Sequence, residues 1–518
     1  MNLSFYLDFG GNMGGLILNE DDSNFGYGFS WGFVPENLTR DEMIKYIESY
    51  IERYKDTQLT DFEMDVCGRL AVYPSKIMES TVDMYYRKEQ NGEPCDFTKT
   101  FVAGYREIFD VYKLDHFKIW IDKCREFGIK SWISVRINDV HETLEKQSVL
   151  SPDFFFENMH LTRGAHHEYK DYYDGGFDFS KSEIYDRMIR LIEEACERYD
   201  SDGINIDFQR ESFCFSPGNE AEGREIITRF MSDVRRIAKE KSVSARVRES
   251  LETSFDLGFD VIKWAKLGLI DRVIVAPRWS TTDCDLPIEL WRRALEPYNV
   301  EICGGIEILL REENKRRPLT FNSVETAYGC AYNIYASGAD KCYLFNYMRI
   351  PGYDDTEAKT RYEGCRESDQ FPLTEENYIE FLKNVGSMET LSKAPRRHFV
   401  SFRDALPFWQ TPTYQVPQKV YNDRYASFRI RAGKTNGDAY VVIGVPNESF
   451  EPERSVMFVN TKKVEFLGAL DEKTCFTKSA LYVYGVRGDY LKNINTVEVV
   501  SGGEAFEIDH IEIRINCK

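Results

Sequence analysis

The sequence has little of what several classes of protein require. Lysine and arginine number 66 against 86 aspartates and glutamates in 518 residues, which gives a formal net charge of −20. Nucleic-acid backbones are bound by clustered basic side chains, so this balance argues against a nucleic-acid partner. No run of 18 or more apolar residues is present, which argues against a membrane-spanning helix. A leader of basic and then apolar residues is also missing, and we expect a cytoplasmic protein.

Motifs for metals and cofactors are missing as well. The 12 cysteines form no C-x-x-C pair, and the seven histidines form no H-x-H or H-E-x-x-H. We therefore expect free thiols and no metal or other cofactor. Cys214 lies between Phe213 and Phe215, which favours packing over a nucleophilic role. The glycines of residues 10–15 lack the Lys-Ser/Thr ending of a phosphate loop, which favours a turn or a close approach of substrate.

What the sequence does contain is a repeat of strand and helix. Residues 114–129 and 182–199 have helical apolar spacing; the first ends at Gly128, and the second follows Ser180 or Ser182 as N-cap. Eight strands alternating with helices predict a (β/α)8 barrel, or TIM barrel, over residues 1–393. The predicted strands begin at Ser4, Asp61, Ser131, Gly203, Ser244, Arg272, Glu301 and Cys342.

Two kinds of segment depart from this repeat. Residues 67–114 and 149–180 follow the second and third strands, and we interpret them as long loops that build the site or its walls. From about Ala394 the apolar residues alternate at period two, with turn residues such as Asn436–Gly437 between the runs. This pattern predicts an antiparallel, sandwich-like β domain over residues 394–518.

Functional side chains of a TIM barrel lie where its strands end, at the carboxyl-terminal face. Arginines recur there on four consecutive strands, and two explanations remain open. Each arginine pairs with a neighbouring carboxylate, Asp207 with Arg210 or Arg246, and Glu249 or Glu307 with Arg248 or Arg278. Alternatively, one or two of them bind the planar carboxylate of an anionic substrate. The residues at the predicted strand ends are Asp8, Asp65, Arg136, Asn138, Asp139, His141, Asp207, Gln209, Arg210, Arg246, Arg248, Glu249, Arg278, Glu307 and Asn346.

His141 and Asp8 are the candidates for acid–base catalysis. A histidine held near a carboxylate stays protonated near neutral pH and donates to a leaving oxygen, and its positive charge suits an anionic sugar. The base is Asp8 or its rival Asp207. The alternatives are a capping or packing role for His141 and an ion pair with an arginine for Asp8.

Several of these residues together resemble a known family. Asp8 at a strand end, Arg136 and His141 within RINDVH, Arg210 after GINIDFQ, and Asn346 in YLFNY are similar to the pattern of glycoside hydrolase family 156, the inverting exo-sialidases, over roughly residues 1–350. The resemblance implies a (β/α)8 barrel with an accessory β region. It implies that His141 is the acid and Asp8 the base, and that Arg136, Arg210 and Asn346 bind sialic acid.

The resulting hypothesis is inverting hydrolysis of a terminal α-sialoside, with a sialylated glycan as partner. We add Asn138, Asp207 and Arg246 to the predicted substrate-binding residues because they also end barrel strands. The alternatives are a glycosidase for another acidic sugar such as a uronide, a barrel that binds acidic glycans without cleaving them, and a metal-assisted hydrolase. The sequence leaves open the linkage preference, a homodimer and the role of the C-terminal β domain.

Overall fold

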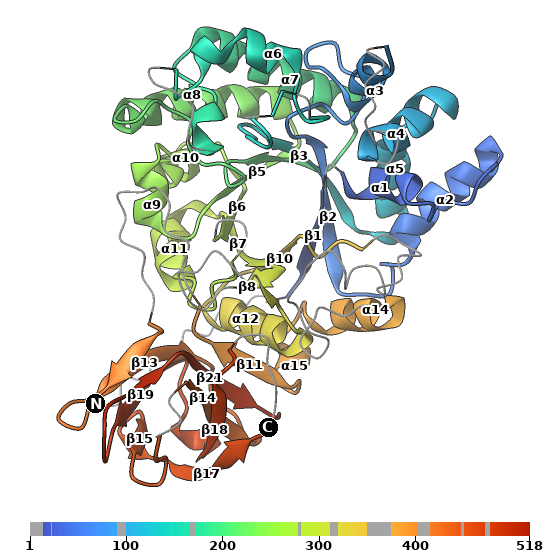
Figure 1. Cartoon of the computed structure of the whole chain (residues 1–518). Coiled ribbons are helices and arrows are strands. Elements are labelled where there is room, and N and C mark those ends of the chain that lie inside the picture. The colour runs from blue at the N-terminus through green and yellow to red at the C-terminus, as the bar shows by residue number, and fades with distance from the viewer. Residues whose placement is uncertain are drawn as a thin grey trace.

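The computed structural model describes residues 14–517 of the chain except 22, 91–99, 144, 147, 166–171, 278–280, 311–319, 350–373, 402–414, 447–449 and 472–476. Eight parallel strands close into a barrel in the order β1-β10-β7-β6-β5-β4-β3-β2 (Figure 1), which confirms the predicted TIM barrel. The barrel strands are β1 (Leu16–Glu20), β2 (Leu59–Cys67), β3 (Lys130–Arg136), β4 (Gly203–Asp207), β5 (Ser242–Arg248), β6 (Arg272–Ala276), β7 (Glu301–Glu307) and β10 (Lys341–Phe345).

The first barrel strand differs from the prediction. Strand β1 is LILNE, Leu16–Glu20, and it pairs with both β2 and β10. The predicted strand from Ser4 lies outside the described residues. The true strand was overlooked because only Leu16, Ile17 and Leu18 are apolar between Gly15 and Asn19, a run too short to stand out.

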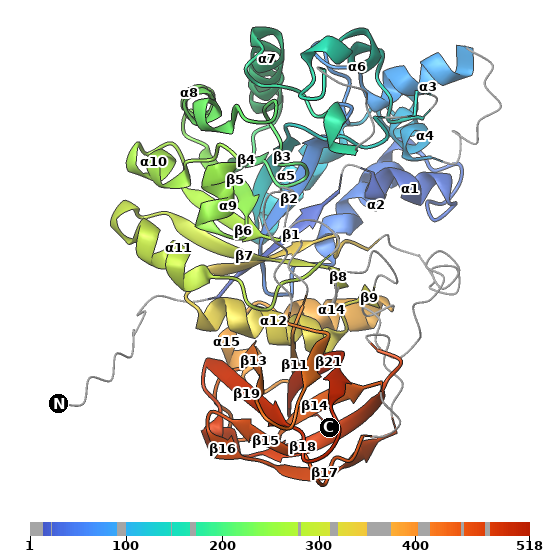
Figure 2. The same ribbon diagram turned by 60° about the vertical axis from the view of Figure 1, so that its left-hand side comes forward.

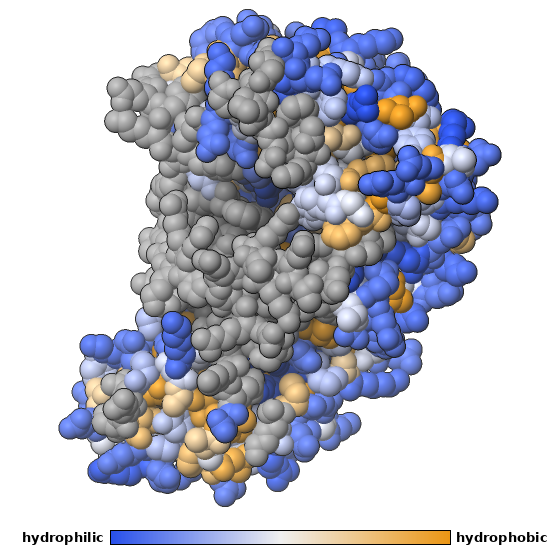
Figure 3. All heavy atoms as spheres, turned by 45° about the vertical axis from the view of Figure 1, so that its right-hand side comes forward, coloured by the Kyte–Doolittle hydropathy of each residue, from blue (hydrophilic) through white to orange (hydrophobic). Residues whose placement is uncertain are grey.

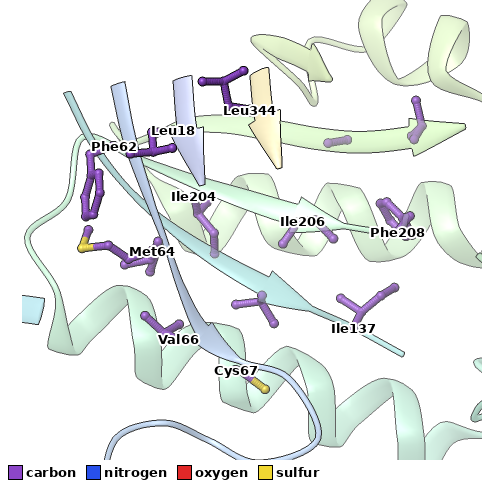
Figure 4. Packing of buried hydrophobic residues seen from close by; sticks show 14 of the residues in the cluster. Leu18, Phe62, Met64, Val66, Cys67, Ile137, Ile204, Ile206, Phe208 and Leu344 are labelled. Atoms are coloured by element: carbon purple, nitrogen blue, oxygen red, sulfur yellow. The ribbon is translucent and has the colours of Figure 1, made fainter. Parts of the chain in front are cut away.

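Side chains of the barrel strands alternate between its two surfaces, as the pleat requires. Outward residues such as Leu18, Phe62 and Ile206 pack into the main core beneath the helices (Figure 4). Inward apolar residues form a separate small cluster in the barrel interior, made by Ile17, Ile274, Cys303, Tyr343 and Phe345. The remaining inward positions of the described strands are largely polar, and this is what places charged groups along the barrel axis.

The amino-terminal end of the barrel is filled by one charged layer. The Asp61 carboxylate binds Nη2 of Arg272 and Nζ of Lys341, each at 2.6 Å. The indole of Trp132 donates to the same carboxylate at 2.9 Å, and the Arg272 guanidinium lies 4.0 Å from the centre of that ring. All four side chains are buried or nearly so, and the two cations lower the pKa of Asp61 to about 2.

The helices follow the predicted alternation, with one difference at a cap. Helix α5 (His116–Phe127) ends at Gly128, whose φ of 71° is the left-handed conformation expected of a C-cap glycine. Helix α7 (Ser182–Arg198) begins after Lys181, with no side-chain cap, so the predicted cap at Ser180 or Ser182 is wrong. The other α-helices around the barrel are α1 (Asn24–Ser30), α2 (Arg40–Glu52), α8 (Glu220–Ala238), α9 (Leu251–Asp256), α10 (Val261–Lys266), α11 (Ile288–Leu295), α12 (Val324–Ala336), α14 (Glu375–Asn384) and α15 (Met388–Leu391).

The segments after the second and third strands contain helices in addition to loops. The first holds α3 (Thr81–Gln90), α4 (Phe101–Arg106) and a π-helical turn at Glu107–Val111. The second holds α6 (Asp153–Glu157) and two 3₁₀ turns at Met159–Leu161 and Tyr172–Gly175. A short hairpin of β8 (Leu309–Leu310) and β9 (Thr320–Phe321) follows β7.

The C-terminal part is antiparallel β structure, as predicted, and it lies beside α12 and α15 at one side of the barrel (Figure 2). One sheet has the order β11-β21-β14-β18-β17 and another β13-β19-β15-β16, with β12 and β20 paired separately. The domain boundary at residue 394 stays a prediction. The strands are β11 (Arg396–Phe399), β12 (Gln418–Val420), β13 (Ala426–Arg431), β14 (Ala439–Val445), β15 (Val456–Val459), β16 (Lys462–Lys463), β17 (Glu465–Leu470), β18 (Ala480–Val486), β19 (Ile494–Val500), β20 (Phe506–Ile508) and β21 (His510–Ile515).

The described surface agrees with the acidic composition. On the face shown in Figure 3, the described residues around the barrel helices are mainly hydrophilic, with small scattered apolar patches. Within the described ranges, no helix combines the length and apolar character needed to cross a bilayer.

Candidate active site

Charged side chains from neighbouring strands meet at the carboxyl-terminal end of the barrel. Because adjacent parallel strands end at one face, residues distant in the sequence come together there. Five of them, each at most 3% exposed, are Asp65 on β2, Arg136 on β3, Asp207 on β4, Arg246 on β5 and Glu307 on β7.

Arg136 is held by two carboxylates. Its Nη2 lies 2.5 Å from Asp65 and 2.8 Å from Asp21, the residue directly after β1. Asp21 was missed because strand one was predicted too early in the chain. Asp8, the predicted base, lies outside the described residues. Asp21 is therefore the carboxylate that follows the first barrel strand, and its side chain is 15% exposed.

The next arginines are paired internally. Nη1 of Arg246 lies 3.0 Å from Asp207, and its guanidinium lies 3.9 Å from the centre of the Phe345 ring. Nε of Arg248 lies 3.0 Å from Glu249. These pairs confirm the internal-pairing interpretation for Arg246 and Arg248. Arg278 lies outside the described residues.

His141 lies between a carboxylate and a guanidinium. Its Nδ1 is 2.6 Å from Oδ1 of Asp139, which also accepts the His141 backbone N–H at 2.8 Å. Its Nε2 is in contact with Nη2 of Arg210. Burial and Arg210 lower the pKa of His141, and Asp139 opposes them. The expectation of a protonated imidazole at neutral pH is therefore not met in this arrangement, because burial and the neighbouring Arg210 outweigh the effect of Asp139.

Asn346 lies against Glu307 at the end of β10. Its Nδ2 donates to the Glu307 carboxylate at 3.0 and 3.3 Å, and its φ of 62° is a conformation that asparagine tolerates better than most residues. Burial raises the pKa of Glu307 to about 7, while Asn346, Arg246 and Arg210 oppose the increase. Glu307 can therefore gain or lose a proton near neutral pH.

Asn138 has a different environment from its neighbours. Its Nδ2 donates to the carbonyls of Phe213 and Phe177, and its Oδ1 accepts from the Phe177 backbone N–H at 2.7 Å. The amide thus connects the end of β3 to two loops. Its predicted contact with substrate stays a prediction, and these bonds favour a positioning role.

A layer of carboxyl groups lies deeper, below the arginines. Glu63 accepts hydrogen bonds from Tyr343 at 2.9 Å and from Asn205 at 3.1 Å, and Asn19 lies between Glu63 and Asp65. Burial and the neighbouring acids raise the pKa of Glu63 to about 8, and burial raises that of Asp65 to about 7. Glu63 was missed because it lies inside β2, two residues before Asp65, which was taken as the strand-end residue.

The remaining chemistry of the described residues is limited. Nine described cysteines are free thiols, and burial raises the pKa of Cys214 to about 12, which favours the predicted packing role. Across the described ranges, no three His, Cys, Asp or Glu side chains are grouped to hold a metal ion.

Fold and site together define a (β/α)8-barrel protein with proton-exchanging groups and arginines at its carboxyl-terminal mouth. No protein-family model and no curated protein sequence matches this chain. Solved structures with a low overall likeness include α-L-fucosidase isoenzyme 2 from Paenibacillus thiaminolyticus, at 13% identity and a TM-score of 0.42, covering 72% of this chain and 48% of that one. The chain thus spans about half the length of that fucosidase.

Two further structures are similar at the same level. The PgaB (BpsB) glycoside hydrolase domain from Bordetella bronchiseptica matches at 9% identity and a TM-score of 0.40, covering 73% of this chain and 99% of that one. Endo-glycoceramidase II from Rhodococcus sp. matches at 13% identity and a TM-score of 0.37, covering 94% and 96%. Likeness this distant carries no information on activity, and the barrel assignment stands on the strand pairing of the chain itself.

Proposed function

We propose that the protein is a glycoside hydrolase for acidic sugars, specifically an exo-α-sialidase that inverts the anomeric centre. The observation that carries the proposal is the Asp139–His141–Arg210 contact at the mouth of the barrel. It combines a group able to donate a proton with a guanidinium able to bind a sugar carboxylate. The choice of sialic acid and of inversion follows the resemblance of the RINDVH and GINIDFQ segments.

The proposed roles follow from exposure and contacts. His141 protonates the departing oxygen, and Asp139 orients its ring. Arg210 and Asn346 bind the substrate, while Arg136 and Arg246, both almost fully buried and paired with carboxylates, hold the walls of the site. Each assignment applies the rule that catalytic contact requires access to substrate.

The base is best supplied by the carboxylate after β1. Asp207, the rival, is 1% exposed at its side chain, and its two oxygens bind Arg246 and the Gln209 backbone N–H. Asp21 is more exposed and lies at the end of the first barrel strand, the place that the prediction gave to Asp8. We therefore propose Asp21 as the residue that activates water. Asp8 remains a prediction for the segment outside the described residues.

A panel of fluorogenic glycosides tests the substrate class. We expect release of fluorophore from a sialoside and none from neutral hexosides. Cleavage of a uronide but not of a sialoside would support the alternative acidic sugar, and tight binding without product release would support a non-catalytic glycan-binding barrel. Activity lost with chelator and restored with Zn²⁺ would instead support a metal-assisted hydrolase.

Proton NMR of the sialoside reaction tests the mechanism. Single displacement by water produces the β-anomer of the free acid first, because water attacks opposite the leaving group. First appearance of the α-anomer would contradict the proposal. His141→Ala should lower kcat about 10²-fold or more, and an equal loss for good and poor leaving groups would argue against His141 as the acid.

A further inference from the structure

The two ring nitrogens of His141 face groups of opposite charge. Nδ1 lies beside the Asp139 carboxylate, and Nε2 lies beside the guanidinium of Arg210, which comes from the bend after β4. Guanidinium has only N–H donors, so Nε2 in this contact must accept and cannot carry a proton. The described arrangement is therefore the neutral tautomer with its proton on Nδ1.

In this tautomer, His141 has no proton on Nε2 to donate to a glycosidic oxygen. To protonate a glycosidic oxygen, the exposed Nε2 must itself carry the proton while Nδ1–H remains bound to Asp139. The charged groups that face the imidazole are Asp139 and Arg136 from the end of β3 and Arg210 from the end of β4. Of these, Asp139 favours the charged ring, and the two arginines disfavour it.

Arg210 is the most exposed of the three arginines Arg136, Arg210 and Arg246. It is 9% exposed, against 1% for Arg136 and 2% for Arg246. A ligand carboxylate entering the mouth therefore changes the contacts of Arg210 more readily than those of its neighbours.

We propose that Arg210 couples the charge of the substrate to the protonation of His141. The substrate carboxylate binds the Arg210 guanidinium, which withdraws its N–H from Nε2 and brings a negative charge beside the ring. Nε2 then takes one proton from solvent water. This inference rests on the proposed function and makes Arg210 a positioning residue for the acid in addition to a binding residue.

The proton balance over one turnover is closed. The proton on Nε2 passes to the glycosidic oxygen as the anomeric C–O bond breaks, and the imidazole becomes neutral again. The attacking water forms a bond from its oxygen to the anomeric carbon and gives one proton to the base, and the base then releases this proton to solvent, which offsets the proton that Nε2 took up. When the acid product leaves, Arg210 returns to Nε2. A neutral sugar does not displace Arg210, so His141 stays uncharged and cannot protonate the glycosidic oxygen. The Arg210–His141 contact therefore selects for anionic substrates.

Proton uptake on binding is the direct test. The probe is a hydrolysis-resistant S-linked sialoside, with its methyl ester as the neutral control, titrated calorimetrically into the full-length protein at pH 7.5 in two buffers of different ionisation enthalpy. We expect uptake close to one proton for the acid and none for the ester. Binding of the acid without uptake would overturn the coupling while leaving the proposed function intact. No binding of the acid would overturn both.

Variants separate charge from structure. In ¹⁵N-histidine-labelled protein without ligand, Arg210→Gln should raise the pKa of His141, whereas Arg210→Lys, which keeps a cation, should leave it low. Arg69→Gln is the matched control, because Arg69 contacts the carbonyl of Asp139 and not the imidazole. A rise in the control equal to that in Arg210→Gln, or no rise in Arg210→Gln, would overturn the proposal.

Discussion

Asp65 lies on β2 and Asp139 follows the neighbouring strand β3, yet the pKa values of their carboxyl groups are shifted in opposite directions. Asp139 faces His141, Arg210 and Arg136, which together hold its pKa well below the usual range. Asp65 is buried beside Asp21 and Asp207, and burial raises its pKa to about 7 although Arg136 opposes the increase. The chemistry of an aspartate in this site is set by the groups that face it.

The first residue-scale prediction concerns Asp139→Asn. The Asp139 charge favours the protonated imidazole, so its removal lowers the pKa of His141. Because the proposed acid acts only when protonated, the alkaline limb of the kcat/KM profile should move to lower pH, with a loss of about 10²-fold at pH 7. Asp153→Asn, on the exposed edge of α6, is the control. An unshifted limb would contradict a role for Asp139 in charging the acid.

The second residue-scale prediction concerns Glu63→Gln. The folded-state pKa of Glu63, about 8, exceeds its ordinary value of 4.5, so its contribution to stability is full at low pH and is lost as the pH rises toward 8. Glutamine stays neutral throughout. A tenfold change in proton affinity corresponds to about 1.4 kcal/mol, so the variant should gain of order 3–5 kcal/mol over wild type at pH 8 and little at pH 4.5.

Urea unfolding of both proteins across this pH range measures the difference. Glu376→Gln, on the exposed face of α14, should follow wild type at every pH. A stability difference that does not change with pH would show that Glu63 is not buried in its protonated form.

Much of the residue-level pattern could be predicted. Arg136, Asp139, His141, Asp207, Arg210, Arg246, Glu307 and Asn346 were identified as strand-end residues, and their contacts place them at one end of the barrel. The pairs Asp207–Arg246 and Glu249–Arg248 were among those predicted. The contacts of Arg136, Arg210 and Asn346 could not be predicted, because they depend on which residues face each other at the mouth of the barrel. For this reason the Arg210–His141 contact and the role of Asn138 in joining two loops emerged only from the structure.

At the scale of elements, seven of the eight barrel strands were predicted and β1 was not. Strand β1 has three apolar residues followed by Asn19 and Glu20, and both of these polar residues are buried by the tertiary structure. Asn19 binds the carboxylates of the neighbouring strand, and Glu20 accepts from Tyr50 at 2.7 Å. Local sequence does not reveal such compensation, and this explains why the strand and its terminal Asp21 were both missed.

The element-scale prediction concerns the crossing of α1 and α4. Two glycines make the contact, and a Cβ on Gly104 would lie 2.2 Å from the carbonyl oxygen of Gly26. Gly104→Ala must therefore separate the helices, and we expect a loss of about 1–3 kcal/mol, as for other overpacked sites. Thermal unfolding measures the loss. Val111→Ala, at a 48% exposed position just beyond α4, should stay within about 0.5 kcal/mol of wild type. An unchanged melting temperature for Gly104→Ala would contradict the prediction, because it would show that α1 and α4 move apart without a loss of stability.

At the scale of the whole molecule, two arginines of β13, Arg429 and Arg431, join the C-terminal sheets to the barrel. Arg431, at the end of β13, binds Asp285 at 2.5 Å, Glu289 on α11, and the Ser337 hydroxyl at 3.0 Å. It is 5% exposed, whereas its two acidic partners are partly exposed. The contact therefore combines a desolvated guanidinium with carboxylates that keep some water.

The whole-molecule prediction is that Arg431→Met weakens this contact. We expect a loss of about 1–3 kcal/mol in the free energy of unfolding, because charged partners lose their hydrogen bonds. Catalytic activity should change little, since Arg431 binds residues outside the strand-end cluster. Arg487→Met removes an exposed pair within the C-terminal part and should leave the free energy of unfolding close to that of wild type. Equal stability losses in the two variants would contradict a special role for Arg431.

The charged layer at the amino-terminal end of the barrel limits how a substrate can enter and leave. It is made by Asp61, Trp132, Arg272 and Lys341. These buried side chains are joined by hydrogen bonds and ion pairs and fill the amino-terminal end of the barrel, so no chain can pass along the barrel axis. Under the proposed function, the aglycone and the free sugar acid must both leave through the carboxyl-terminal mouth by which the substrate enters. The free sugar acid should therefore act as a competitive inhibitor.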